Sequence, residues 1–282
     1  MEVILAKHAG FCFGVKRALD IVLEETKKNN SNLYTFGPLI HNEYVVNMLA
    51  EKGVLMMEED KDPSSYEAGT VVIRSHGVTE AKLNEIKAAG HKIVDATCPF
   101  VAKIHNTVAT QSRDQKHIIV LGDPDHPEVK GIVGWCKTDK ISVISSEEEA
   151  NNFNGNTNEE YYLVAQTTFR VKKFKELVEI LKQKGYNIYA LNTICNATEE
   201  RQSEAARIAG EVDVMLVIGG KSSSNSQKLY EICRENCKDT IFIQTSDDLD
   251  LSVPRSISRV GITAGASTPD IIIEEVTKKC QK

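Results

Sequence analysis

Three of the seven cysteines occupy the same kind of position, a short turn between a predicted strand and a predicted helix. They are Cys12, Cys98 and Cys195, which follow the strand-like runs 3–6, 92–94 and 187–189. The N–H groups and the dipole of a helix N-terminus favour the thiolate, the form that binds metal ions or attacks electrophiles. For one such cysteine alone, packing of a small apolar residue in a turn would be the simpler interpretation.

The repetition of this turn changes the interpretation. Successive cysteines are separated by about one small α/β unit, so three similar units packed about a pseudo-threefold axis would bring the turns together. Three thiolates at one point would repel each other unless a metal centre neutralised them. The pattern therefore predicts a metal centre held by three cysteines.

Strand-like and helical patterns alternate along the whole chain, which predicts an α/β fold with parallel sheets and helices on their faces. The remaining predicted strands are 33–36, 54–56, 71–74, 117–121, 141–143, 161–165, 214–218, 240–243 and 260–263. Predicted helices include 42–52, 80–89, 171–184, 227–236 and 268–280, and residues 151–160 are expected to form a polar loop. We expect three similar α/β units, 1–97, 98–194 and 195–282, each containing one of the three cysteines.

Composition narrows the class of protein. The chain has 282 residues, 41% hydrophobic and 26% charged, with a formal net charge of −6, which argues against a nucleic-acid-binding scaffold. No apolar run approaches the roughly 18 residues of a membrane span, and the N-terminus lacks the pattern of a signal peptide. An odd number of cysteines without a secretion signal indicates reduced thiols, so we expect a cytoplasmic protein.

The loops that follow the predicted strands are rich in polar residues. Because ligands of parallel sheets bind beyond the carboxyl ends of the strands, these loops are candidate binding segments. Their candidate residues are His41, His76, His126, Glu128, Thr167, Thr168, Ser223, Ser224, Asn225 and Ser267. Hydroxyl groups, imidazoles and the N–H groups of Gly-rich loops suit a phosphate. Each loop alone would be typical of an ordinary turn, but their coincidence predicts an anion site, in which Glu128 could donate a proton.

The other cysteines and histidines have simpler interpretations. Cys233 and Cys237, four residues apart on a predicted helix, continue its apolar side and are expected to pack in the core. Neither Cys136 nor Cys280 has neighbours that suggest chemistry. The remaining histidines are expected to be packed or surface residues; they are His8, His91, His105 and His117.

Several motifs resemble those of the 4-hydroxy-3-methylbut-2-enyl diphosphate reductases, enzymes of the last step of the methylerythritol phosphate route to isoprenoids. The segments that carry the resemblance are 9–15, 95–99, 126–131, 166–168, 223–226 and 263–267. Together they extend over nearly the whole chain.

The resemblance implies a set of site residues. Cys12, Cys98 and Cys195 would hold a [4Fe–4S] cluster with one iron open to substrate, and this cluster can be isolated as [3Fe–4S]. The diphosphate pocket would contain His41, His76, His126, Ser223, Ser224, Asn225 and Ser267. Thr167 and Thr168 would lie near the substrate, and Glu128, Thr167 and His126 would be the catalytic residues, with Glu128 as the proton donor.

The resemblance also implies the reaction and its partners. An allylic diphosphate would lose its hydroxyl group in a two-electron reduction and yield isopentenyl and dimethylallyl diphosphate. Electrons would come from reduced ferredoxin or flavodoxin, and we expect a monomer that binds neither nucleic acid nor membrane.

Two other functions remain compatible with the residues alone. Three cysteines could hold a zinc ion that activates water against a phosphate ester. Alternatively, the chain could bind a cluster and a diphosphate as a sensor without turnover, although binding alone has no need of a proton donor such as Glu128.

Overall fold

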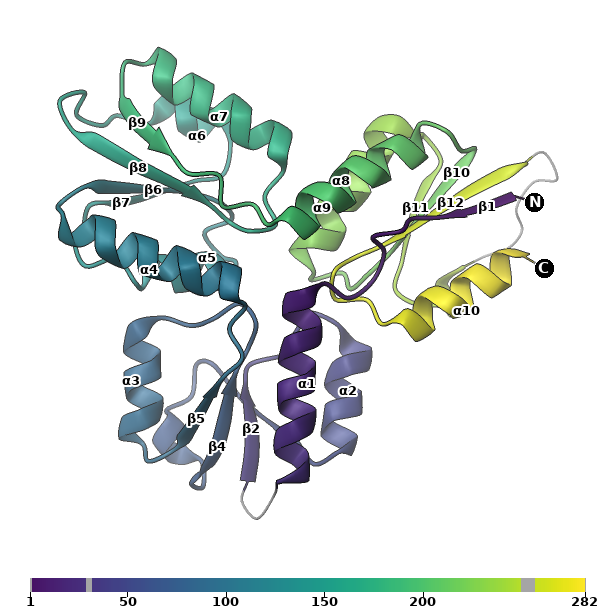
Figure 1. The fold of residues 1–282 in the computed structure, drawn as a ribbon, viewed down its shortest axis with the longest axis horizontal. Helices are drawn as coiled ribbons and strands as arrows, with labels where there is room; N and C mark the ends of the chain where they lie inside the picture. The colour runs from purple at the N-terminus through teal and green to yellow at the C-terminus, as the bar shows by residue number, and fades with distance from the viewer. Residues whose placement is uncertain (1, 29–31, 250–256, 282) are drawn as a thin grey trace. The chain divides into compact units, whose positions relative to one another are not determined.

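The computed structural model describes residues 2–28, 32–249 and 257–281, which form three four-stranded parallel sheets with helices (Figure 1). The chain divides into two compact units. The terminal unit consists of Met1–Lys16, Ile40–Met48 and Asn196–Lys282, and the central unit of Arg17–Leu39 and Leu49–Cys195. Two helices cross this division, α1 (Phe13–Lys27) and α2 (Glu43–Glu51). None of the helices formed by these residues is long and apolar enough to cross a membrane.

The sheet of the terminal unit has the order β1-β12-β10-β11. Its strands are β1 (Glu2–Leu5), β10 (Val214–Ile218), β11 (Thr240–Ile243) and β12 (Arg259–Ala264). Helices α8 (Asn196–Ala209) and α9 (Ser224–Asn236) cover one face, and α10 (Asp270–Gln281) covers the other (Figure 1). Strand β10 is buried on both sides: Leu216 packs in the cluster that includes α10, and Met215 packs in the cluster that includes α8 and α9.

One sheet of the central unit has the order β3-β2-β4-β5. Its strands are β2 (Asn32–Phe36), β3 (Leu55–Met57), β4 (Gly69–Ile73) and β5 (Lys92–Asp95). Helix α3 (Glu80–Ala88) begins at the side-chain cap of Thr79, and its buried Ile86 packs in one core cluster with Tyr34 and Val71.

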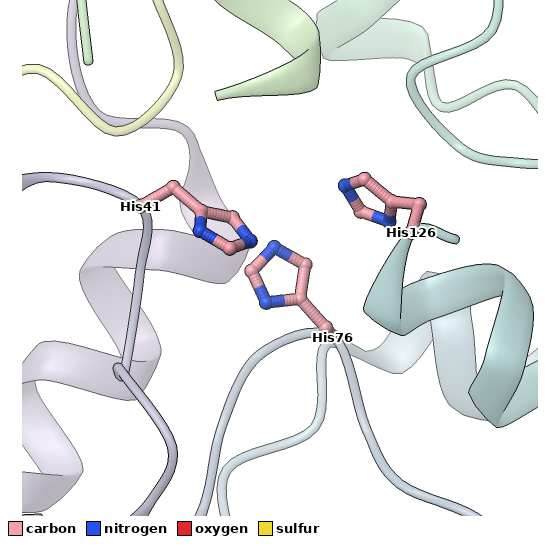
Figure 2. A group of neighbouring side chains, drawn as sticks. All are labelled: His41, His76 and His126. Carbon is pink, nitrogen blue, oxygen red and sulfur yellow. The ribbon is translucent and has the colours of Figure 1, made fainter. Parts of the chain in front are cut away.

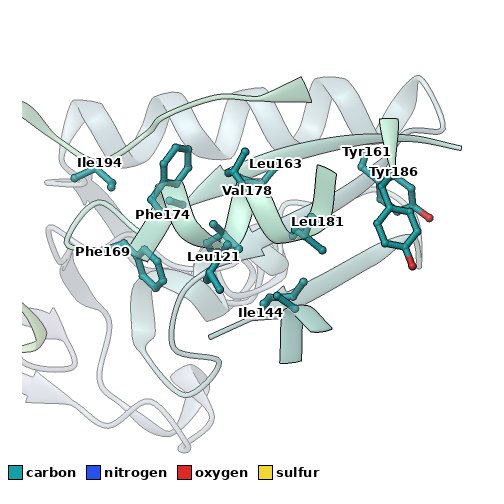
Figure 3. Close-up of a cluster of buried hydrophobic side chains, with 14 residues drawn as sticks. Leu121, Ile144, Tyr161, Leu163, Phe169, Phe174, Val178, Leu181, Tyr186 and Ile194 are labelled. Atoms are coloured by element: carbon teal, nitrogen blue, oxygen red, sulfur yellow. The ribbon is translucent and has the colours of Figure 1, made fainter. Parts of the chain in front are cut away.

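The other sheet of the central unit has the order β7-β6-β8-β9. Its strands are β6 (His117–Leu121), β7 (Ile141–Ile144), β8 (Glu160–Ala165) and β9 (Asn187–Ala190). Helices α4 (Pro99–Arg113) and α5 (Pro127–Val133) cover one face, and α6 (Glu147–Asn152) and α7 (Val171–Gln183) cover the other (Figure 1). Figure 3 shows the core on the α7 side, where Phe174, Val178 and Leu181 recur at helical spacing in one cluster with Leu163 of β8.

The predicted α/β class with small parallel sheets is confirmed, and so is every predicted strand, to within two residues at its ends. The strand at the start of the chain has a distant partner, because β1 pairs in parallel with β12, with Val3 opposite Val260. The sheet of the last predicted unit is thus completed by the first strand of the chain. The predicted boundaries after residues 97 and 194 fall just beyond β5 and β9; the three-unit division itself stays a prediction. The predicted polar loop begins inside α6, which ends at Asn152.

Candidate active site

The three cysteines lie at equivalent places in the three sheets. Each follows an edge strand (β1, β5 or β9), and its backbone N–H donates to a carbonyl in the loop after the neighbouring strand (β12, β4 or β8). The donor–acceptor distances are 3.2 Å from Cys12 to Ala266, 3.0 Å from Cys98 to Ser75 and 3.1 Å from Cys195 to Thr167. The same local geometry therefore fixes each cysteine turn, although no two of the turns share a sequence.

The cysteines of these turns are suited to be ligands of a metal centre. All three thiols are partly exposed, and none forms a disulfide. Cys98 is the residue that caps α4, and Pro99 is the first helical residue, as predicted. Three soft sulfur ligands, each next to a helix N-terminus, suit an iron–sulfur cluster, which is held by cysteine thiolates. By contrast, Cys233, Cys237 and Cys280 are buried in apolar clusters, and for Cys233 and Cys237 this confirms the packing interpretation.

A carboxylate and a threonine form a buried pair in the central unit. The backbone N–H and the hydroxyl of Thr167 donate to the two carboxylate oxygens of Glu128, at 2.6 and 2.7 Å. Thr167 follows strand β8, and Glu128 lies in the first turn of α5. Only 2% of Glu128 and 7% of Thr167 are exposed, so the pair is shielded from bulk water.

His126 caps the helix that carries Glu128. Its Nδ1 accepts the N–H of Glu128 at 3.1 Å, which places the proton of the neutral imidazole on Nε2. The ring of His76 stands edge-on to that of His126, with centroids 5.5 Å apart (Figure 2). One ring nitrogen of each lies within 4.8 Å of the other, so two predicted binding residues are adjacent within the central unit.

The loop of His76 is held by a glycine and a buried histidine that the sequence analysis left outside the site. Gly77 has a φ of 70°, and a Cβ there would lie 2.6 Å from Cε1 of His105. His105 is 4% exposed, stacks on Trp135 and also approaches Gly131 of α5. His105 thus packs between the loop of His76 and the helix that His126 caps.

The terminal unit gathers another set of predicted residues at the start of α9. Ser223 caps this helix and accepts bonds from the hydroxyls of Ser226 at 3.0 Å and Ser267 at 3.4 Å. The hydroxyl of Ser267 also lies 3.4 Å from the backbone oxygen of His41. Asn225 is 6% exposed, and its Nδ2 has no hydrogen-bond partner among the described residues. Hydroxyls, a helix N-terminus and an unpartnered amide donor form a cradle suited to an anion.

Two buried polar residues of α8 were not predicted from the sequence, and one of them, Arg201, contacts the Cys12 turn. Arg201 and Gln202 are buried on α8, in the stripe that contains Ala205 and Ile208. A charged residue within an apolar stripe is the signal that could have revealed Arg201, because burial of a charge requires specific partners.

The chain is similar to proteins of one family along its full length. Residues 3–281 match the profile of the LytB protein family. The 4-hydroxy-3-methylbut-2-enyl diphosphate reductase of Caldanaerobacter subterraneus is 45% identical over 280 residues, which cover 99% of this chain and 96% of the relative.

Two solved structures are also similar. A structure of (E)-4-hydroxy-3-methyl-but-2-enyl diphosphate reductase, described as the terminal enzyme of the non-mevalonate pathway, is 40% identical with a TM-score of 0.70, covering 100% of this chain and 99% of the other. The Plasmodium falciparum E-1-hydroxy-2-methyl-but-2-enyl-4-diphosphate reductase is 26% identical with a TM-score of 0.93, covering 100% of this chain and 88% of the other.

Proposed function

Because this chain belongs to the LytB protein family, we propose that it is a 4-hydroxy-3-methylbut-2-enyl diphosphate reductase. The reaction breaks the carbon–oxygen bond of the allylic alcohol and releases the hydroxyl group as water. Two electrons and two protons enter, and the products are isopentenyl and dimethylallyl diphosphate. The observation that carries the proposal is the repeated cysteine turn, in which three partly exposed thiols, none of them in a disulfide, have the same backbone hydrogen bond.

Cys12, Cys98 and Cys195 are the residues that would hold the iron–sulfur cluster, one from each of the three equivalent turns. A [4Fe–4S] cluster with three protein thiolates has one iron without a cysteine. When bound, the cluster would supply one electron at a time and a Lewis-acidic iron for the substrate hydroxyl group. Reduced ferredoxin or flavodoxin would deliver these electrons to a monomeric, cytoplasmic enzyme, a location favoured by the odd number of cysteines.

Glu128 and Thr167 would deliver the proton that turns the leaving hydroxyl group into water. The hydroxyl of Thr167 contacts the Glu128 carboxylate directly, so a proton held by Glu128 can reach the substrate through Thr167. Burial of both residues limits competing proton exchange with bulk water. His126, which is bonded to the backbone of Glu128, would orient this acid and present its Nε2–H to the diphosphate.

The diphosphate would bind to the polar residues that end the strands. In the terminal unit, Ser223, Asn225 and Ser267 surround the N-terminus of α9, where backbone N–H groups and the helix dipole favour an anion. The Nδ2 of Asn225 has no hydrogen-bond partner within residues 2–28, 32–249 and 257–281, which supports a ligand oxygen as its acceptor. The remaining proposed substrate contacts are His41, His76, His126, Ser224 and Thr168.

The proposal is tested by counting iron and acid-labile sulfide per chain after strictly anaerobic purification, together with the visible absorption spectrum. We expect about four of each and a brown chromophore that is lost in the Cys12→Ser, Cys98→Ser and Cys195→Ser variants. Cys136→Ser is the matched control, because Cys136 is a partly exposed thiol outside the three turns. A colourless protein that carries about one zinc ion and forms no cluster on reconstitution would refute the reductase and favour a zinc hydrolase.

A further inference from the structure

A buried arginine on α8 forms hydrogen bonds with the turn that carries Cys12. The guanidinium of Arg201 donates from Nε to the backbone oxygen of His8 and from Nη2 to that of Gly10, both at 2.8 Å. Its Nη1 donates to the backbone oxygen of Ala197 in the first turn of α8, at 3.2 Å. With 4% of its surface exposed, this side chain contacts the turn as an internal support.

The carboxylate of Glu204, one helical turn further along α8, binds the same segment. It accepts from backbone N–H groups, whereas Arg201 donates to backbone carbonyls. The two oxygens of Glu204 accept the backbone N–H groups of Lys7 and His8, each at 2.9 Å. Residues three apart on a helix lie on one face, so Arg201 and Glu204 reach the turn together. Two carbonyls and two N–H groups between residues 7 and 10 are therefore fixed by charged side chains.

The rest of the turn is fixed by the sheet. The N–H of Cys12 donates to Ala266 at 3.2 Å, and Gly10 has a φ of 93°, a conformation that side-chain-bearing residues rarely adopt. A Cβ at Gly10 would also lie 2.9 Å from the Asp270 carboxylate. The backbone before Cys12 is thus held by α8 and the backbone of Cys12 itself by the loop after β12.

We propose that Arg201 and Glu204 are positioning residues that set the place of the Cys12 thiol as a cluster ligand, an inference that rests on the proposed function. We call the bonds from Arg201 and Glu204 to residues 7–10 the clamp. Helix α8 begins directly after Cys195, another proposed ligand, and the clamp attaches the Cys12 turn to this helix. Arginine suits this task because its planar fork donates in several fixed directions, which the single ammonium of lysine cannot reproduce.

The clamp is tested first in the protein without a cluster. We expect hydrogen exchange of a peptide covering residues 6–12 to rise about tenfold or more in Arg201→Met and Glu204→Gln, with a smaller rise in Arg201→Lys. Arg207→Met is the matched control, because Arg207 lies on the same helix but is exposed and forms an ion pair with Glu211. Exchange no faster than in this control would overturn the clamp, and Glu204→Gln decides the question if Arg201→Met does not fold.

The second test uses the protein loaded with its cluster. We expect Arg201→Met and Glu204→Gln to release iron to a chelator about tenfold faster than Arg207→Met and to change the EPR signal of the reduced cluster. Faster exchange at residues 6–12 with unchanged iron release and EPR signal would show that the clamp does not position a ligand. If the wild-type protein holds no iron, the proposed function fails, whereas the exchange measurement still decides whether the clamp exists.

Discussion

Thr167 donates both its backbone N–H and its hydroxyl to the carboxylate of Glu128, so one residue fixes both oxygens of the buried acid. The pair joins the loop after β8 to the first turn of α5, two segments almost forty residues apart in the chain. The N–H of Cys195 donates to the backbone oxygen of Thr167 at 3.1 Å. Thr167 therefore contacts the proposed acid through its N–H and hydroxyl groups and a proposed cluster ligand through its backbone oxygen.

We expect Glu128→Gln to retain iron and substrate binding but to lose about 10²- to 10⁴-fold in turnover, because an amide has nearly the same shape and no acidic proton. Iron content, substrate affinity and single-turnover rate should be measured together. Glu149→Gln is the matched control, because Glu149 also accepts the N–H and hydroxyl of one residue, Ser145, but lies exposed on α6. Normal turnover in Glu128→Gln would remove Glu128 from the acid role.

A comparison of Ser223→Ala with Ser146→Ala distinguishes loss of diphosphate binding from loss of a helix cap. The loss of the side-chain cap of α9 should cost about 1 kcal/mol in the free energy of unfolding, and the loss of a phosphate contact should weaken substrate binding about tenfold. Ser146→Ala removes an equivalent cap from α6 and should cost similar stability while leaving the KM unchanged. Equal KM values in the two variants would contradict a diphosphate site at α9.

The sequence predicted the elements well because most of them carry clear periodicity. Helix α7, for example, begins at Val171 as predicted, and its apolar stripe is the one that packs on β8. The partner of β1 could not be predicted in the same way, since the pattern of residues 3–6 indicates a strand and carries no information about its neighbour. Only the tertiary structure shows that Val3 lies beside Val260.

The candidate site shows a similar limit. Motifs identified Glu128 and Thr167 separately, but their two hydrogen bonds depend on the packing of α5 beside β8. Supporting residues such as Arg201 were missed because helical periodicity treats a buried position as apolar. Three acceptors of the Arg201 guanidinium are backbone carbonyls, which every residue carries, so the sequence alone does not identify them.

Thiol reactivity should separate the two classes of cysteine. In the reduced protein without a cluster, four partly exposed thiols should react with iodoacetamide at pH 8: Cys12, Cys98, Cys136 and Cys195. Cys233 should react only after unfolding, because it is fully buried and its burial raises its pKa to about 12. Loading of the cluster should leave only Cys136 reactive. Mass spectrometry of the peptide that contains Cys12 measures its labelling. If Cys12 is still labelled in the loaded protein, Cys12 is not a ligand.

The pH dependence of stability should report on His105, whose burial lowers its pKa from 6.5 to about 4 despite the opposing charge of Asp95. The unfolded chain takes up this proton near pH 6.5 and the folded chain only near pH 4. Above pH 6.5 this histidine is neutral in both states and does not change the free energy of unfolding. As the pH falls from 6.5 toward 4, protonation of the unfolded chain lowers the free energy of unfolding by about 3 kcal/mol in total. Denaturant unfolding of His105→Gln should give a free energy that falls less steeply over this range. A slope in His105→Gln equal to that of the wild type would show that His105 is not the group that titrates.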